Sequence, residues 1–373
     1  MPEATTVRGR LVIGDDIVPG VITVSDGHIA AIEPDEAATA GPIIAPGFID
    51  IHVHGWGGHD AMGDRGALDG MSRALLRRGV TSFLPTAVTA STDRLRAFAD
   101  GVRTWVPNAP RDGADPLGFN LEGPFLAAAK KGAHAADLLQ QPADVPDDTI
   151  DELLEGLRII TIAPELAGAV PLISRLARAG VRVSLGHSAA SLAVSRDGYA
   201  AGAVSTTHLF NAMSGLTHRD PGLALAALED DDVWTELIAD GHHVDRAMWP
   251  LIARLKPASK LILVSDAIPI AGSGEGSGRL GDLEISVVDG RVTLPDGTIA
   301  GSVIALDTAV RELVTSGSAL PRAIQAASTN PAELLGADDR GRLAPGCRAD
   351  LVRLDADLEI ADVMRRGEWI DPA

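Results

Sequence analysis

The sequence contains little cysteine, few aromatic residues and no long apolar run, and each shortage excludes a class of protein. Cys347 is the one cysteine among 373 residues, so no disulfide can form within the chain. No apolar stretch reaches the ~18 residues of a membrane-spanning helix, and residues 1–20 lack the charged start and apolar run of a signal peptide. We therefore expect a cytoplasmic protein with no membrane partner.

Basic residues are also scarce relative to acidic ones. The chain has 32 Lys and Arg against 51 Asp and Glu, a formal net charge of −19. Nucleic acids and anionic membranes are bound through basic patches, so neither is an expected partner. Aromatic residues make up 3% and hydrophobic residues 46% of the chain, so aliphatic side chains must fill most of a sizeable core.

Short alternating strands are predicted at both ends of the chain. Residues 7–32 contain the runs RLVIG, GVITVSDG and HIAAIEP, and Asp26-Gly27 between the last two is typical of a hairpin turn. The C-terminal run CRADLVRLDADLEIADVMRRGEWI is also rich in strand-forming residues. We expect residues 1–46 and residues 344–373 to build one small β-sandwich domain together.

Residues 47–343 alternate apolar, strand-like runs with amphipathic, helix-like ones. Helix candidates often end at a glycine, as at Gly79, Gly180 and Gly202. A segment near 280–300 has Asp-Gly turns and predicts an inserted β-hairpin, with two helices following around 303–316 and 320–335. The eight strand candidates are FIDIHVHG, VTSFLPTAV, GFNLEGPF, RIITIAPE, VRVSLGHS, AVSTTHLFNA, WTELIADG and KLILVSDA. Eight βα units predict an α/β fold with a TIM-type (β/α)8 barrel.

Polar side chains stand at the C-terminal ends of these strands, where TIM-barrel active sites lie. His52 and His54 are two residues apart on one strand, so both imidazoles share a face and suit zinc, iron or another first-row metal. Glu122 lies among apolar residues, where a carboxylate is costly unless it binds a metal or forms a salt bridge, with Lys130 or Lys131 as the alternative partner. We predict one or two divalent ions, zinc or iron favoured, with the ligands His52, His54, Glu122, His187 and His208.

Asp266 closes the apolar run LILVSDA. An acid at this position can orient an attacking water, take its proton and later protonate a leaving amine. A helix cap or a further metal ligand is the alternative role. We predict that Asp266 is the general acid/base of a metal-dependent hydrolase.

Longer motifs resemble the amidohydrolase superfamily and, within it, the N-acetylglucosamine-6-phosphate deacetylase family. The motifs that carry the resemblance are PGFIDIHVHGWGG, NLEGPFLAAAKKGAH, SLGHSAA, THLFNAMSGLTHRDPG, IADGHHVD, LVSDAIPIAG and TIAGS. The resemblance implies hydrolysis of the acetamide of N-acetylglucosamine 6-phosphate to glucosamine 6-phosphate and acetate. It also implies that Glu122 can bridge two metal ions.

The resemblance further implies a role for each matching position. Asp266 matches the catalytic acid/base, and His243 matches a histidine that stabilises the acetyl oxygen. Arg219 matches an arginine that reaches the phosphate from the neighbouring subunit, which implies a homodimer; a pair with Asp220 is the alternative. The implied substrate-binding residues are His134, Asn211, Ala212, Arg219, His243, Gly301 and Ser302.

Three features depart from the family pattern. They are His242 before His243, the segment Ile268-Pro269 after Asp266, and His218 before Arg219. They leave the choice between gluco and galacto sugars open. Other N-acetylated hexosamines, with or without phosphate, cyclic amides and non-enzymatic sugar-phosphate binding are the alternatives. The histidines with no predicted role are His28, which we expect at the surface, His59, His218 and His242.

Overall fold

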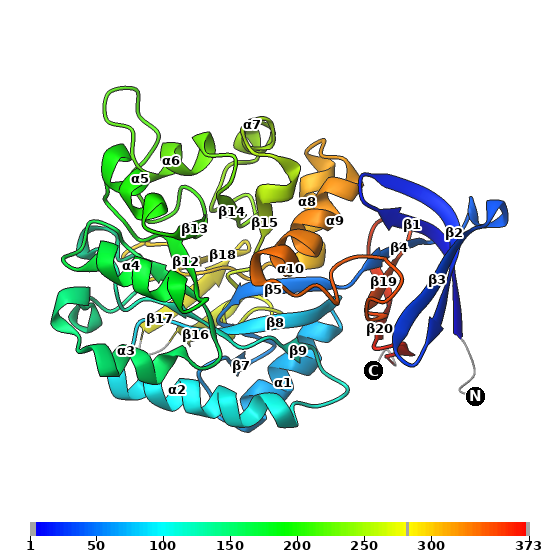
Figure 1. The fold of residues 1–373 in the computed structure, drawn as a ribbon, viewed down its shortest axis with the longest axis horizontal. Helices are drawn as coiled ribbons and strands as arrows, with labels where there is room; N and C mark the ends of the chain where they lie inside the picture. The colour runs from blue at the N-terminus through cyan, green and yellow to red at the C-terminus, as the bar shows by residue number, and fades with distance from the viewer. Residues whose placement is uncertain (1–4, 281–282, 371–373) are drawn as a thin grey trace.

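The computed structural model describes residues 5–280 and 283–370. It contains a ring of helices around a parallel sheet and, beside it, a smaller sheet that combines both ends of the chain (Figure 1). The expected segments 1–46, 280–300 and 344–373 each include residues outside the described ones. Among the residues that are described, no helix is long and apolar enough to cross a membrane.

The central sheet is the TIM-type (β/α)8 barrel that the eight βα units predict. Its strands follow one another in parallel around the barrel, in the order β15-β14-β13-β12-β11-β10-β8-β5. The ring closes just beyond β15, where the Asp266 amide donates to the His52 carbonyl at 2.9 Å. The strands are β5 (Phe48–Val53), β8 (Val80–Ala87), β10 (Phe119–Glu122), β11 (Leu157–Ile162), β12 (Arg182–Leu185), β13 (Ala203–Thr206), β14 (Trp234–Leu237) and β15 (Leu261–Leu263).

The barrel strands are apolar because both of their faces are covered. Every residue of β5 and β8 is buried, as expected for parallel strands between a packed interior and a layer of helices. Polar caps begin several helices: the side chains of Asp64, Ser91 and Ser191 each accept a hydrogen bond from a first-turn amide. The helices are α1 (Arg65–Leu76), α2 (Thr92–Trp105), α3 (Asp147–Leu154), α4 (Ala169–Arg178), α5 (Leu192–Ala200), α6 (Leu223–Glu229), α7 (Trp249–Leu255), α8 (Leu306–Thr315), α9 (Leu320–Ala327) and α10 (Thr329–Leu335).

The second sheet has seven strands in the order β21-β20-β19-β4-β1-β2-β3. Ile29 of β3 and Met364 of β20 lie near opposite edges of this order, yet both belong to one buried apolar cluster, so the sheet folds over a core of its own. The Asp26-Gly27 turn has φ values of 51° and 76°, as its sequence predicts. The strands are β1 (Thr5–Ile13), β2 (Asp16–Ser25), β3 (His28–Pro34), β4 (Ile43–Pro46), β19 (Leu351–Leu354), β20 (Ile360–Arg365) and β21 (Glu368–Trp369).

The segment after the barrel's last strand differs in two details from its sequence prediction. The inserted hairpin is a three-stranded antiparallel sheet of β16 (Gly276–Leu280), β17 (Leu283–Val288) and β18 (Arg291–Thr293). The single helix expected around 320–335 is divided at Ser328 into α9 and α10. Pro331 explains the break, because it has no amide hydrogen with which to continue α9.

A buried aspartate joins the barrel to the terminal sheet. Asp115 of β9 (Asp115–Pro116) is 7% exposed and forms ion pairs with Arg340, Arg348, Arg365 and Arg366. Burial alone would raise the pKa of the Asp115 carboxyl, but the guanidinium charges outweigh burial and hold its pKa well below the usual range. Its stabilising contribution is therefore present at neutral pH and is lost only as the pH falls into the acid range.

We expect Asp115→Asn to lower the free energy of unfolding by about 3–5 kcal/mol, because it leaves buried guanidinium groups without their counter-charge. Denaturant unfolding followed by circular dichroism measures this change. Asp112→Asn is the matched control, since Asp112 pairs with Arg73 at an exposed site and should change stability by less than about 1 kcal/mol. Equal effects of the two substitutions would show that the Asp115 cluster does not stabilise the fold.

Candidate active site

The polar side chains at the strand ends meet at one mouth of the barrel. His52 lies in β5, and Glu122 is the last residue of β10. His187, His208 and Asp266 follow β12, β13 and β15, and all three have a positive φ, at 46°, 27° and 48°. This left-handed backbone is costly for a residue other than glycine and is concentrated at functional sites. The chain thus turns sharply at the points where these side chains enter the mouth.

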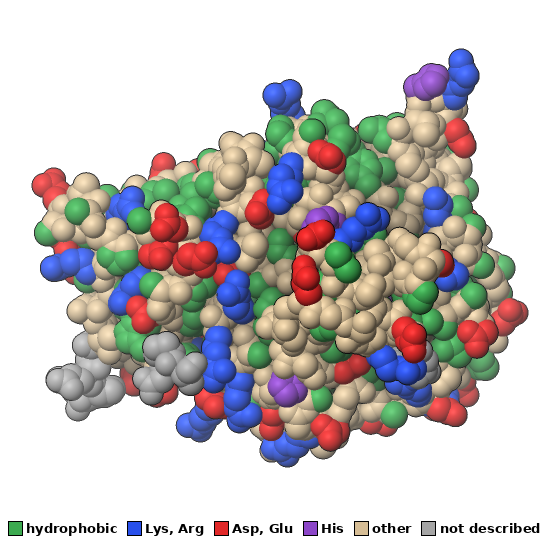
Figure 2. All heavy atoms as spheres, turned by 180° about the vertical axis from the view of Figure 1, so that it is seen from behind, with side chains coloured by type: hydrophobic (Ala, Val, Ile, Leu, Met, Phe, Trp, Pro, Cys, Tyr) green, Lys and Arg blue, Asp and Glu red, His purple; other side chains and the backbone are tan. Residues whose placement is uncertain are grey.

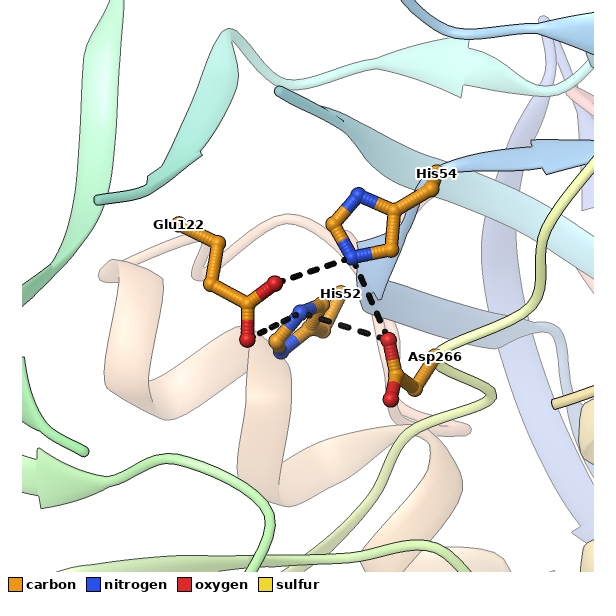
Figure 3. A group of neighbouring side chains, drawn as sticks. All are labelled: His52, His54, Glu122 and Asp266. Carbon is orange, nitrogen blue, oxygen red and sulfur yellow. Dashed lines mark ion pairs between the residues drawn. The ribbon is translucent and has the colours of Figure 1, made fainter. Parts of the chain in front are cut away.

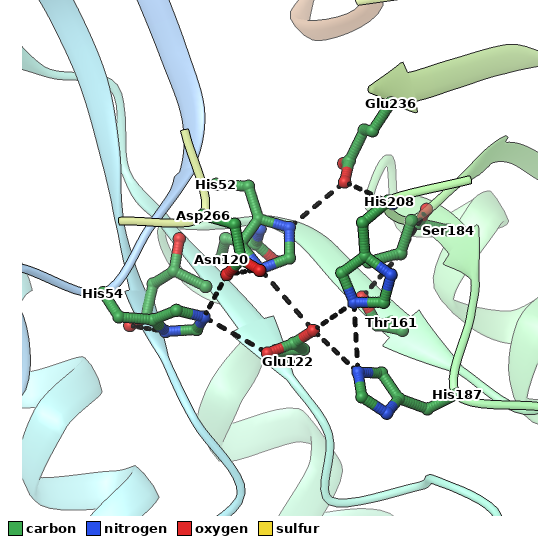
Figure 4. Close-up of polar contacts among 12 residues, drawn as sticks. His52, His54, Asn120, Glu122, Thr161, Ser184, His187, His208, Glu236 and Asp266 are labelled. Carbon is green, nitrogen blue, oxygen red and sulfur yellow. Dashed lines mark hydrogen bonds and ion pairs between the residues drawn. The ribbon is translucent and has the colours of Figure 1, made fainter. Parts of the chain in front are cut away.

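The Glu122 carboxylate joins two groups of possible metal ligands (Figures 3 and 4). In each group the ligand atoms lie within 4.8 Å of one another: the first group is His52, His54, Glu122 and Asp266, and the second group is Glu122, His187 and His208. Glu122 Oε1 lies 2.9 Å from both His187 Nε2 and His208 Nε2, while Oε2 lies 3.2 Å from His54 Nε2. One carboxylate therefore faces both groups.

Hydrogen bonds at the outer nitrogens aim three of the rings toward Glu122. His52 Nδ1 lies 3.1 Å from Glu236 Oε2, and the Nδ1 atoms of His54 and His187 lie 3.1 Å and 2.8 Å from backbone carbonyl oxygens. Carbonyl and carboxylate oxygens only accept, so each Nδ1 carries the hydrogen. In the neutral form of each ring the Nε2 lone pair then faces the centre, as metal-ligating histidines require.

His134 also touches Glu122, but with the opposite tautomer. The Thr89 amide donates to His134 Nδ1 at 3.2 Å, so this nitrogen is an acceptor and the hydrogen of the neutral ring is on Nε2. Nε2 lies 3.1 Å from Glu122 Oε2 and donates to it. This arrangement makes His134 a hydrogen-bond donor toward the centre.

In the metal-free site the carboxylates hold protons on the rings of the first group. Burial alone would lower the pKa of His54, but hydrogen bonds to Asp266 and Glu122 raise it to about 9. Burial would likewise raise the pKa of Asp266, yet the hydrogen bond from His54 holds it at about 2. Burial lowers the pKa of His187, in the second group, to about 4. At neutral pH the two rings of the first group are therefore protonated, their carboxylates are charged, and the His187 ring is neutral.

The donor atoms fit divalent ions. His52 Nε2 is buried, has no hydrogen-bond partner among the described residues, and lies 3.6 Å from both Glu122 Oε1 and Asp266 Oδ1. Imidazole nitrogens and carboxylate oxygens are ligands that zinc and other first-row metals accept. An ion between these atoms would take the place of the protons that the His52 and His54 rings otherwise hold.

His54, Glu122, His187, His208 and Asp266 form the floor of a pocket of about 410 Å³, a volume suited to a small ligand. Its walls include Asn211, Ala212, His243 and Gly301, as the resemblance implies. The inserted sheet closes one side, because Leu280 and Leu283 also line the pocket. The pocket thus combines a charged floor with a partly apolar wall.

His243 is held by a neighbouring acid. Its Nδ1 lies 2.7 Å from Asp240 Oδ2, so it donates there, and the Asp240 side chain also accepts from the His243 amide. Burial would raise the pKa of Asp240, but the hydrogen bonds from His243 outweigh burial and lower it. Asp240 thus fixes the orientation of the His243 ring, which lines the pocket.

Two predicted residues do not reach this pocket with their side chains. Ser302 is buried, and its hydroxyl donates to the Ser265 carbonyl at 2.5 Å. Arg219 is exposed on the segment between β13 and α6, which projects from the body of the molecule in both views (Figures 1 and 2). The alternative salt bridge from Glu122 to Lys130 or Lys131 is not among the described ion pairs, in which Glu122 pairs only with histidines.

Sequence reasoning missed three acids that hold the site together. Glu236 accepts from His52, Asp240 accepts from His243, and Glu165 accepts from the Ser188 hydroxyl beside His187. Glu236 carried a signal, because it is the one acid within the strand segment WTEL of β14. Nothing in the sequence names its partners, which lie on other strands.

Comparisons with known proteins point to one family. A sequence model of the amidohydrolase family matches residues 43–370. The chain is 37% identical over 357 residues to an N-acetylgalactosamine-6-phosphate deacetylase of Escherichia coli O157:H7, covering 93% of each chain.

Solved structures of two deacetylases have the same fold over nearly the whole chain. The N-acetylglucosamine-6-phosphate deacetylase of Thermotoga maritima superposes with a TM-score of 0.93 at 33% identity, covering 99% of this chain and 100% of its own. That of Mycobacterium smegmatis, in complex with N-acetyl-D-glucosamine-6-phosphate, gives 0.91 at 33% identity and 99% coverage of both chains.

We expect zinc binding to the metal-free protein to release protons at pH 7.5, because the ion must displace the proton that His54 holds up to a pKa of about 9. Calorimetric titration in buffers of different ionisation enthalpy should show a release of about one proton or more per chain. The release should shrink as the pH rises through 9. His28→Gln, at an exposed site, should leave it unchanged. Binding heats that agree in all buffers would contradict this account.

Proposed function

Because the chain belongs to the amidohydrolase family, we propose that it hydrolyses the acetamide of N-acetylglucosamine 6-phosphate to glucosamine 6-phosphate and acetate. The observation that carries the proposal is Glu122, shared by two ligand groups in a pocket that Asp266 and His243 also line. The names of the relatives supply the substrate class.

The two ligand groups make the enzyme metal-dependent. We propose His52, His54, Glu122, His187 and His208 as the ligands of one or two divalent ions, with zinc or iron favoured by the imidazole and carboxylate donors. Such an ion, when bound, polarises a carbonyl and activates water.

Asp266 and His243 are the proposed catalytic residues. The Asp266 carboxylate takes a proton from the attacking water and delivers it to the amine nitrogen as the carbon–nitrogen bond breaks. His243 donates a hydrogen bond from Nε2 to the acetyl oxygen, where negative charge develops. Since the Nδ1 hydrogen already bonds Asp240, this step uses a second hydrogen, on Nε2.

The remaining pocket residues would bind the sugar phosphate. The proposed contacts are His134, Asn211, the Ala212 backbone, Gly301 and the loop at Ser302. The galacto epimer is a second candidate substrate, since the Escherichia coli relative is named for it. Other N-acetylated hexosamines and cyclic amides remain the alternatives for the substrate panel.

We propose that Arg219 binds the phosphate in the pocket of a second copy, which makes the enzyme a homodimer. Arg219 does not line the pocket of its own chain, and its loop projects outward (Figure 2). Leu216, on the same segment, is an exposed apolar side chain, at 44%. A cytoplasmic location fits a chain whose one cysteine forms no internal disulfide.

Acetate release from a substrate panel tests the proposed function. We expect rapid release from N-acetylglucosamine 6-phosphate, slower release from its galacto epimer and from the free sugar, loss on chelation and recovery with a divalent ion. A preference for the galacto epimer would reassign the sugar. No release from any hexosamine would overturn the substrate assignment.

Asp266→Asn is the matched variant for this assay. It keeps the side-chain volume but cannot carry the proton, so we expect turnover to fall by about 10²–10⁴-fold with metal content unchanged. Substantial remaining turnover would exclude the acid/base role.

Mixing two inactive variants tests whether Arg219 acts between subunits. Arg219→Ala and Asp266→Asn should each be weak alone, whereas a mixed dimer contains one complete site. After dissociation and random reassociation of equal amounts, we expect about a quarter of wild-type activity. Activity no greater than the sum of the two variants would place Arg219 outside the partner's site.

A further inference from the structure

We propose that Glu236 is a positioning residue that holds the two ligand groups in register and is required for the second metal ion. The inference deepens the proposed metal-dependent function and rests on it. It concerns an acid at the end of β14 that touches neither the pocket nor the substrate residues.

Glu236 reaches one residue from each group (Figure 4). Its Oε2 lies 3.1 Å from His52 Nδ1 and 3.1 Å from the His208 amide nitrogen, and both atoms donate to it. The Glu236 carbonyl also accepts from the Leu209 amide at 2.9 Å. One residue of β14 therefore fixes a ring of β5 and the backbone that follows β13.

The burial of Glu236 requires an explanation. The residue is 1% exposed, and its Oε1 has no hydrogen-bond partner among the described residues. A buried carboxylate costs several kcal/mol unless positive charge lies near it. Among the described ion pairs, its one partner is His52. Glu236 therefore depends on positive charge at the His52 ring, and a metal ion bound at His52 Nε2, on the far side of that ring, would supply it.

The two groups depend on Glu236 to different degrees. In the first group it is the side chain that holds the Nδ1 hydrogen of His52 and so aims Nε2 at Glu122 and Asp266. In the second group it holds only the backbone of His208, while His187 is aimed by the Lys130 carbonyl. Removing the carboxylate should therefore weaken the first group selectively.

Zinc titration of the metal-free protein, with metal content measured by mass spectrometry, tests the inference without any sugar. We expect two ions per wild-type chain, and about 10–100-fold weaker binding of one of them in Glu236→Leu. Glu236→Gln should fall between the two, because its amide oxygen still accepts from Nδ1 but carries no charge. If Glu236→Leu does not fold, the zinc affinities of Glu236→Gln alone still test the inference.

Asp307→Asn is the matched control, since Asp307 is also a buried barrel carboxylate, 1% exposed, but pairs with Arg78. It should bind both ions as the wild type does. Three outcomes would each overturn the inference. They are wild-type zinc affinities in both Glu236 variants, an equal loss of zinc affinity in the Asp307→Asn control, and a single zinc ion per wild-type chain. Absence of acetate release with the zinc result intact would reject only the proposed substrate.

Discussion

The site depends on one constraint, which is that the Glu122 carboxylate is buried and must be compensated. Burial would raise its pKa, but the surrounding histidines hold that pKa well below the usual range. Five imidazoles approach it, four from the two ligand groups and one from His134. When protons alone balance the negative charge of Glu122, the protonated imidazoles cannot bind a metal ion. With divalent ions, the same atoms become ligands, so the electrostatics that stabilise the pocket also define its chemistry.

Barrel geometry explains why these groups meet. Parallel strands end at the same rim of the barrel, so side chains that are far apart in the sequence lie close together in space. The acids missed from the sequence lie one layer outward: Glu236 accepts a hydrogen bond from His52, and Asp240 accepts one from His243. Such outer partners orient rings and keep their hydrogens on the correct nitrogen. The strained turns after three strands are tolerated because packed strands on both sides hold them.

The inserted sheet and the terminal sheet, which both lie outside the barrel, make different contacts with it. The inserted sheet of β16, β17 and β18 packs its own apolar cluster against Ile268 and Ala300 and supplies one wall of the pocket. The terminal sheet lies beside the barrel, anchored through Asp115. The Asp115 cluster stabilises the joint, and the Glu122 cluster serves the chemistry. Both use buried carboxylates, but arginines surround the first and titratable histidines the second.

The sequence alone determined the barrel, because eight apolar strand segments alternate with amphipathic helices, several of which end at a glycine, and this periodicity is local. It also determined which strand ends bear His, Glu and Asp. It predicted that His52 and His54 share a face, since residues i and i+2 of a strand point the same way. The tertiary structure alone decided the ring tautomers, the sharing of Glu122 between two groups, and the partners of Glu236 and Asp115. Those depend on contacts between strands distant in the chain, and hydrogen-bond direction follows from the partner atom. The helix break at Ser328 follows from Pro331, which is a local feature of the sequence. The position of Arg219 outside its own pocket is set by the path of the chain, which residue spacing does not encode.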